Sequence, residues 1–236
     1  MMEQKVLMTD PRKIDSYYEE AIKTLRTNIQ FSGIEMKVIL MTSCYPNEGK
    51  SDVVFQLARE MGKIRKKVLL LDADIRKSSF VKRFQVEGEI TGLSHLLSGQ
   101  AVGKNIIYST NYPNVDMIFA GPSVPNPSEL LSQKAFGSLI DILKERYDYI
   151  LVDTPPVASV IDAVVVAKQC DAALLVIESD AVSHKMAAKV KEQLDRTGCK
   201  VLGAVLNKAD VTRDKYYTKY GYYYQKTDKK AESRKK

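Results

Sequence analysis

The stretch Lys37–Ser51, KVILMTSCYPNEGKS, decides the fold. Residues 37–43 form a near-continuous apolar run, which is typical of a strand buried on both faces. The next residues end in Gly49, Lys50 and Ser51, and a helical pattern follows over 49–63. A loop that ends Gly-Lys-Ser between a strand and a helix is the P-loop arrangement, whose backbone N–H groups surround phosphates. The stretch therefore predicts an α/β domain with a nucleotide-phosphate site.

Apolar runs of the same kind recur along the chain and alternate with helical patterns. Further strands are predicted over 67–72, 115–120, 149–153, 172–178 and 200–206, and helices over 16–31, 133–146, 158–168 and 182–197. This order predicts a P-loop NTPase-like, doubly wound, mainly parallel sheet flanked by helices. Ligands of such sheets bind beyond the carboxyl ends of the strands.

Composition limits the class of protein. The chain has 236 residues, of which 44% are hydrophobic and 28% charged, so it can bury a sizeable core. Cys44, Cys170 and Cys199 have no paired spacing, which argues against a disulfide framework or a zinc site and favours the cytoplasm. The sequence shows no signal-peptide pattern and no apolar run long enough for a membrane span.

The excess positive charge lies at one end of the chain. The net charge is +7, and residues 211–236 hold nine Lys or Arg against three Asp or Glu, a local charge of +6. A basic face on the globular part is therefore not indicated, and nucleic acid is not an expected partner. We expect one domain over 1–210 and a flexible, disordered basic tail over 211–236. The tail carries six tyrosines: Tyr216, Tyr217, Tyr220, Tyr222, Tyr223 and Tyr224.

Three aspartates stand at the ends of predicted strands. Asp72 and Asp74 follow VLLL, and Asp153 ends YDYILVD. Any one of them could simply cap the next helix. Together with a Gly-Lys-Ser loop they predict a Mg²⁺-nucleotide site, in which Lys50 reaches the terminal phosphates and the Ser51 hydroxyl binds the metal.

These motifs resemble those of the bacterial tyrosine kinase family of the capsular and exopolysaccharide type. SCYPNEGKS (43–51) resembles its Walker A motif, VLLLDADIRKS (68–78) its second, Asp-rich Walker motif, and YDYILVDTPPV (147–157) its Walker B motif. Further matches are EAIKTLRTNIQFS (20–32), GLSHLLSG (92–99) and GPSVPNPSELL (121–131). The resemblance covers nearly everything from about Glu20 to Asn207.

The resemblance implies a Mg²⁺- and ATP-dependent protein-tyrosine kinase. The nucleotide would be held by Asn47, Glu48, Gly49, Lys50, Ser51 and Asp52, with Asn207 near the adenine. Mg²⁺ would be organised by Ser51, Asp74 and Asp153, and the catalytic residues would be Lys50, Asp72, Asp74 and Asp153. Asp72 is the first candidate for accepting the tyrosine proton, and Asp74 is the second.

The resemblance also implies substrates and partners. The tail tyrosines would be autophosphorylated between neighbouring subunits. Glu20, Lys23 and Arg26, in a helix within residues 1–33, would hold an unphosphorylated ring together. A membrane-anchored activator of the polysaccharide co-polymerase type would recruit the kinase to the inner face of the cell membrane. A cognate tyrosine phosphatase would reverse the reaction, and the process controlled would be capsular or exopolysaccharide synthesis or export.

The sequence departs from the family pattern at four positions. Asn47 stands where glycine is common, which predicts backbone strain, and Asp52 follows Ser51 where threonine is usual, which places a carboxylate near phosphate and metal. Ser78 replaces a usual proline. Lys23 replaces an arginine of the Glu-x-x-Arg-x-x-Arg pattern, and because lysine has no bidentate fork we expect weaker ring assembly.

Three other functions compete with the kinase. A partitioning or cell-division-site ATPase would carry an early P-loop lysine, where this chain has Tyr45. A GTPase is favoured by Asn207-Lys208-Ala209-Asp210, which has the form of the guanine-reading motif, but Asp153-Thr154-Pro155-Pro156 lacks the glycine of a GTPase switch. A scaffold that uses nucleotide only to assemble is the non-enzyme alternative.

Overall fold

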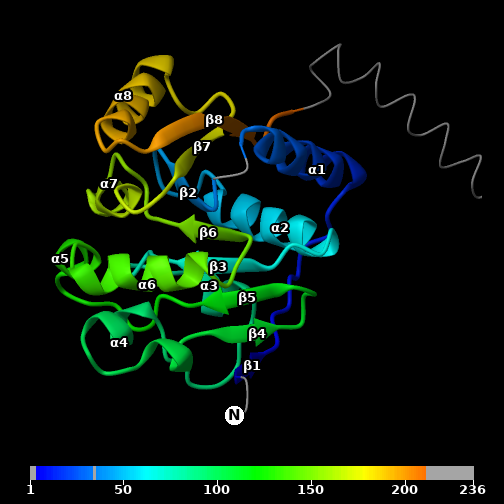
Figure 1. Cartoon of the computed structure of the whole chain (residues 1–236). Coiled ribbons are helices and arrows are strands. Elements are labelled where there is room, and N and C mark those ends of the chain that lie inside the picture. The colour runs from blue at the N-terminus through cyan, green and yellow to red at the C-terminus, as the bar shows by residue number, and fades with distance from the viewer. Residues whose placement is uncertain (1–3, 34–35, 211–236) are drawn as a thin grey trace, which may run out of the picture.

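The computed structural model describes residues 4–33 and 36–210, and within them the chain forms an eight-stranded sheet covered by helices (Figure 1). The strands are β1 (Gln4–Val6), β2 (Val38–Ser43), β3 (Val68–Asp72), β4 (Tyr108–Thr110), β5 (Val115–Ile118), β6 (Tyr149–Asp153), β7 (Ala172–Glu178) and β8 (Lys200–Asn207). The helices are α1 (Ser16–Phe31), α2 (Lys50–Lys63), α3 (Phe80–Arg83), α4 (Leu93–Leu97), α5 (Pro127–Leu131), α6 (Lys134–Lys144), α7 (Asp162–Ala167) and α8 (His184–Asp195), with a 3₁₀ turn η1 (Gly103–Asn105). The tail 211–236 and its tyrosines lie outside the described residues.

The strand order is β1-β4-β5-β3-β6-β2-β7-β8. The paired strands run parallel, except that β4 and β5 are antiparallel. The doubly wound, mainly parallel sheet predicted from the sequence is thus confirmed. Because β3, β6 and β2 are neighbours, their carboxyl ends place the second Walker motif, the Walker B motif and the P-loop side by side.

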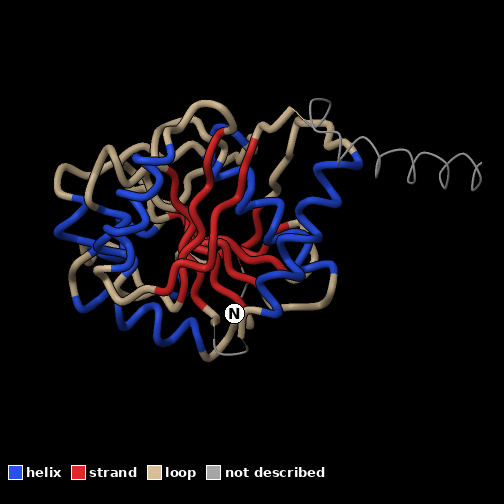
Figure 2. The backbone as a smooth tube through the Cα atoms, turned by 90° about the horizontal axis from the view of Figure 1, so that it is seen from above, coloured by secondary structure: helices blue, strands red, loops and turns tan. Residues whose placement is uncertain are grey.

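Two hydrophobic cores explain why the central strands are apolar over most of their length. Alternate side chains of β2 point to opposite faces: Val38 and Leu40 enter one core, and Ile39 and Met41 enter the other. Helices α5 to α8 cover the first face, and α1, α2 and α3 cover the second. Figure 2 shows the strands between these two layers of helices. None of the helices in the described ranges is long and apolar enough to cross a membrane.

Two sequence-based expectations are wrong. Strand β8 was expected to be buried on both faces, but it is an edge strand, and its residues are half-buried or exposed in the described part of the chain. The helix expected over 158–168 begins only at Asp162. Before it, the backbone N–H groups of Val157 and Ala158 donate to the carbonyls of Ser43 and Cys44, and residues 157–159 form a separate turn that is held against the end of β2. The short strands β1 and β4 have too few residues to give a sequence pattern.

Candidate active site

The side chain of Glu48 ties the end of the P-loop to its beginning. Glu48 is 2% exposed, and its Oε2 accepts hydrogen bonds from the backbone N–H groups of Cys44 at 2.7 Å and Tyr45 at 3.1 Å. Asn47 has a φ of 66°, in the left-handed region that glycine enters freely. The strain expected from asparagine at this position is therefore present in the backbone. Gly49, with a φ of 86°, forms the N-cap of α2.

Lys50, Ser51 and Asp153 meet at the carboxyl ends of β2 and β6. Ser51 Oγ donates to Asp153 Oδ2 at 2.7 Å, and Lys50 Nζ lies 3.3 Å from the same oxygen and 3.1 Å from Ser51 Oγ. Asp153 is 1% exposed, and its other oxygen, Oδ1, has no hydrogen-bond partner among the described residues. Burial raises the pKa of Asp153, and the Lys50 ammonium opposes that rise. An unpaired, buried carboxylate oxygen beside a P-loop lysine is suited to a metal ion.

Asp72 lies next to Asp153, because the two are register partners on β3 and β6. It is fully buried, and burial, followed by the charge of Asp153, raises its pKa to about 8. Ser78 Oγ donates to Asp72 Oδ2, and the backbone N–H of Asp74 donates to Oδ1 at 3.1 Å. Asp74 is half-buried, and its Oδ1 accepts from the Lys77 N–H at 3.0 Å. The structure thus brings the three predicted aspartates together.

Asp52, the residue after Ser51, lies in a group of arginines. Its Oδ1 is 2.7 Å from Arg12 NH1 and is also paired with Arg83. Arg12 belongs to the segment before α1, and Arg83 ends α3. These cations offset the carboxylate that the sequence places near the phosphate site. A nucleotide contact from Asp52 itself stays a prediction.

The end of β8 braces the P-loop from the other side. Asn207 Nδ2 donates to the Glu48 carbonyl at 2.8 Å, and Lys208 Nζ donates to the Asn47 carbonyl at 2.7 Å. A Cβ added at Gly49 would lie 2.2 Å from Asn207 Nδ2, so a side chain does not fit there unless Asn207 moves. The structure brings Asn207 to the predicted site, and a contact with the adenine stays a prediction.

One polar cluster beside the strand-end aspartates was missed in the sequence. Arg76, two residues beyond Asp74, forms a bidentate ion pair with Asp162 at the start of α7, and Ser128 of α5 bonds to both. Arg76 lies within the quoted motif VLLLDADIRKS. Asp162 and Ser128 gave no signal, because 86 residues separate Arg76 from Asp162 and no local pattern links them.

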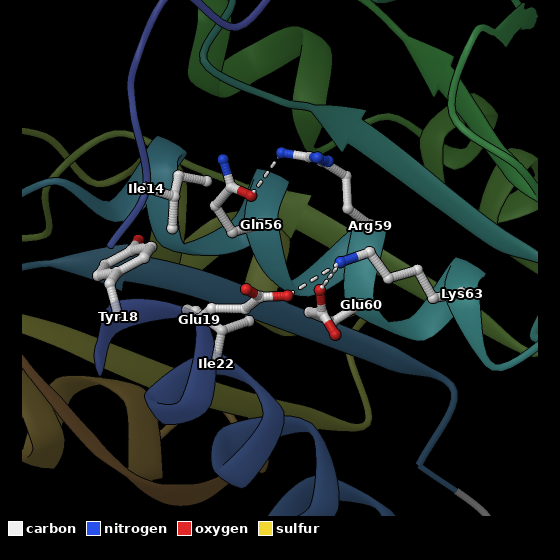
Figure 3. Close-up of a pocket in the computed structure, with 8 residues that line it drawn as sticks. All are labelled: Ile14, Tyr18, Glu19, Ile22, Gln56, Arg59, Glu60 and Lys63. Atoms are coloured by element: carbon white, nitrogen blue, oxygen red, sulfur yellow. Dashed lines mark hydrogen bonds and ion pairs between the residues drawn. The ribbon is translucent and has the colours of Figure 1, made fainter. Parts of the chain in front are cut away.

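The predicted oligomer residues lie on α1, apart from the strand-end aspartates. Lys23 pairs with Glu20 at 3.4 Å on the exposed surface, whereas Arg26 is directed to α2 and lies 3.6 Å from Glu60. A cavity of about 120 Å³ lies close by between the two helices; Figure 3 shows its lining residues, Ile14, Tyr18, Glu19, Ile22, Gln56, Arg59, Glu60 and Lys63. It shares no lining residue with the Lys50–Asp153 group. A role of Glu20, Lys23 and Arg26 in assembly stays a prediction.

Comparisons with known proteins agree with the sequence resemblance. A family model described as an AAA domain matches residues 19–200. The chain is 40% identical over 212 residues to the tyrosine-protein kinase CpsD of Streptococcus pneumoniae, covering 90% of this chain and 91% of that protein. It is 36% identical over 225 residues to the tyrosine-protein kinase YwqD of Bacillus subtilis, covering 94% and 92%. The solved kinase domain of the Escherichia coli tyrosine kinase ETK superposes with a TM-score of 0.78 at 33% identity, covering 82% of this chain and 76% of that one.

Proposed function

Because this chain belongs to the family of bacterial tyrosine-protein kinases, we propose that it transfers the γ-phosphoryl group of ATP to tyrosine hydroxyls. The observation that carries the proposal is the convergence of Lys50, Ser51 and Asp153, with Asp72 beside them. Phosphoryl transfer asks little covalent chemistry of a protein, and its catalysts work by positioning groups and neutralising charge. A P-loop lysine next to strand-end carboxylates suits this task.

The residues present fit ATP and Mg²⁺. The loop Asn47–Asp52 and Asn207 would hold the nucleotide, and Ser51, Asp74 and Asp153 would hold the metal. The unpaired Oδ1 of Asp153 supports this assignment, because Mg²⁺ takes one or two carboxylates and completes its shell with phosphate oxygens and water. Bound Mg²⁺ neutralises charge on the phosphate oxygens during transfer.

The protein's own residues supply orientation and a proton acceptor. Lys50, held 3.3 Å from Asp153, is pre-positioned to neutralise charge on the terminal phosphates. Asp72, in its ionised form, accepts the proton of the tyrosine hydroxyl, and its raised pKa of about 8 makes it a stronger base than an ordinary carboxylate. Asp74 is the alternative base.

The acceptors are the tail tyrosines of a neighbouring subunit. The tail carries a charge of +6 and is attracted to the acidic side chains at the strand ends, Asp72, Asp74 and Asp153. Each phosphotyrosine adds about −1.5 to −2, so phosphorylation of all six inverts the sign of the tail. The modified tail then leaves its neighbour, and the ring joined through the Glu20, Lys23 and Arg26 surface loosens. Light scattering on phosphorylated and phosphatase-treated protein tests this. Equal masses in both samples contradict it.

The kinase acts with a membrane-anchored activator of the polysaccharide co-polymerase type, which brings it from the cytoplasm to the membrane. A cognate phosphatase resets the tail, and the cycle regulates capsular or exopolysaccharide synthesis or export. The named kinases among the relatives support this setting. We expect the isolated chain to phosphorylate itself poorly, and the cytoplasmic end of the activator to stimulate it. Equal activity with and without that peptide contradicts the dependence on an activator.

The deciding experiment incubates the full chain with γ-labelled ATP and Mg²⁺, with and without the activator peptide, and maps phosphotyrosine by mass spectrometry. Label on the tail tyrosines supports the kinase. Nucleotide hydrolysis and assembly without label favour a partitioning-type scaffold ATPase. Activity with GTP but not ATP assigns Asn207–Asp210 to guanine recognition.

A further inference from the structure

Arg76, Ser128 and Asp162 form a polar cluster that joins three separate segments beside the strand-end aspartates. Arg76 Nε donates to Asp162 Oδ2 at 2.6 Å, and Arg76 NH2 donates to Asp162 Oδ1 at 3.0 Å. Ser128 Oγ donates to Asp162 Oδ1 at 2.5 Å and accepts from Arg76 NH2 at 3.1 Å. Each member of the cluster is therefore bonded to the other two.

The chemistry of the cluster makes it a stiff connection. The Asp162 side chain is 0% exposed, so its charge depends on partners inside the protein. Arg76 offers a planar fork that binds both oxygens of the carboxylate at once, which fixes orientation as well as distance. Without Arg76, a buried carboxylate would lose its counter-charge, and this is among the most costly losses that a protein interior can suffer.

The cluster connects the two loops that carry the strand-end aspartates. Arg76 lies two residues beyond Asp74 on the loop that leaves β3, and Asp162 begins α7 after the segment that follows Asp153. Ser123 Oγ donates to the Arg76 carbonyl at 2.9 Å, which ties the same loop to the segment before α5. Arg76 thus holds its loop through both its side chain and its backbone.

A restraint is needed here because Asp74 and Asp153, which lie on different loops, repel each other. Asp72 and Asp153 are fully buried register partners, and the charge of Asp74 acts on both. Like charges in a low-dielectric site push their loops apart. A rigid link between these loops opposes that force without placing another cation among the phosphate-binding groups.

We propose that Arg76, Asp162 and Ser128 form a positioning clamp that sets the separation of Asp74 and Asp153, the two carboxylates that would hold Mg²⁺. The clamp rests on the proposed function, since it is the Mg²⁺-nucleotide that needs this separation. Its members are positioning residues: they act through the aspartates and do not touch the substrate.

The test compares Arg76→Ala, Arg76→Lys and Ser128→Ala with Asp171→Asn in the full chain. Asp171 is a matched control, because it also makes several bonds, to the backbone N–H groups of Lys37 and Val38 and to Lys144, but at the opposite end of the sheet. The first measurement is the affinity for a fluorescent ATP analogue with and without Mg²⁺. The second is hydrogen exchange of peptides that cover 72–78 and 154–162.

For Arg76→Ala we expect Mg²⁺-dependent affinity to fall on the order of 10- to 100-fold, with faster exchange in both peptides. Arg76→Lys should behave similarly, because lysine cannot span both oxygens, and Ser128→Ala should show a smaller loss. Asp171→Asn should lower the melting temperature and leave both site measurements unchanged. Methylguanidinium should restore part of the affinity of Arg76→Ala, and methylammonium should not.

Unchanged exchange and affinity in Arg76→Ala and Ser128→Ala overturn the clamp, as does an equal loss in Asp171→Asn. If Arg76→Ala fails to fold, Arg76→Lys and Ser128→Ala decide by the same criteria. A wild-type chain that binds the Mg²⁺-nucleotide but never labels a tyrosine overturns the kinase proposal alone, and binding and exchange still judge the clamp. A wild-type chain without Mg²⁺-dependent binding overturns both.

Discussion

The two ends of the sheet use aspartate in opposite ways. Where β2 and β3 begin, Asp171 accepts from the Val38 N–H and Asp148 from the Lys67 N–H, each at 2.8 Å. Lys144 Nζ lies 2.8 Å from the second oxygen of Asp171. These carboxylates are paired with backbone donors and a lysine at the partly exposed edge of the sheet, so they stabilise the strands that they cap.

Where the strands end, aspartates occupy buried positions that lower the stability of the fold. Asp72 and Asp153 are buried side by side, and one oxygen of Asp153 has no hydrogen-bond partner among the residues that the structure describes. Burial raises the pKa of both groups. Buried groups with raised pKa values gather at functional sites, where stability is given up for chemistry. The contrast separates aspartates that build the fold from aspartates that serve the reaction.

The largest expected difference between the two ends concerns their lysines. Lys50→Met should lower tail phosphorylation about 1000-fold, because it removes the cation that faces the terminal phosphates. Lys144→Met, which removes the lysine of Asp171 at the other end, should leave phosphorylation close to that of the wild type. Transfer of labelled phosphate under identical conditions measures both. Persistent labelling by Lys50→Met would show that the site has been placed wrongly.

Replacing an aspartate by asparagine should have opposite effects on stability at the two ends of the sheet. Folded Asp72 keeps its proton up to about pH 8, whereas the unfolded chain releases it near 3.8, so the stability of the wild type falls as pH rises between these values. Without nucleotide and Mg²⁺, Asp72→Asn should therefore stabilise the protein at pH 9, by about 3 kcal/mol, and hardly at all at pH 4. Asp171→Asn should destabilise it by about 1–2 kcal/mol. Denaturant unfolding at both pH values checks this, and a destabilised Asp72→Asn at pH 9 refutes it.

Glycines test how tightly the site is packed. Gly49→Ala should cost about 2 kcal/mol and weaken nucleotide binding, because the new Cβ meets Asn207 and the φ of 86° is strained for alanine. Gly99→Ala is the matched control: its φ is 75°, but no atom lies within 4 Å of the added Cβ. It should cost about 1 kcal/mol and leave binding unchanged. Similar nucleotide affinities in the two variants would show that Asn207 moves aside freely.

The smallest expected effect concerns two asparagines with left-handed backbone. Asn47, in the P-loop, has a φ of 66°, and Asn114, before β5, has a φ of 60°. Asn47→Gly should change stability by no more than about 0.5 kcal/mol, because relief of strain offsets the entropy of glycine. Asn114→Gly also loses the hydrogen bond from Nδ2 to the Gly62 carbonyl and should cost about 1 kcal/mol. Thermal unfolding of both variants checks the ranking, and a reversed order contradicts it.

Sequence patterns predicted the features that depend only on residues close together in the chain. The central strands were found because both of their faces are buried, and the P-loop was found because its residues are consecutive. Strand β8 has the same apolar composition, but no local pattern tells an edge position from a central one. The bond between Arg76 and Asp162 depends on how the β3–α3 and β6–α7 loops meet, which only the folded topology decides. Asn47 and the three aspartates were therefore identified from sequence, whereas the contacts of Arg76 with Asp162 and Ser128 were not.

The brace between β8 and the P-loop has a consequence for synthesis on the ribosome. The hydrogen bond from the Asn207 side chain to the Glu48 carbonyl spans 159 residues of sequence. The one from Lys208 to the Asn47 carbonyl spans 161. Contacts of such long range form late in folding, because most of the chain must be ordered first. The phosphate loop is thus translated early and completed last. A nascent or prematurely terminated chain that lacks β8 would carry every Walker motif and still lack a finished nucleotide site, which ties the onset of activity to completion of the domain.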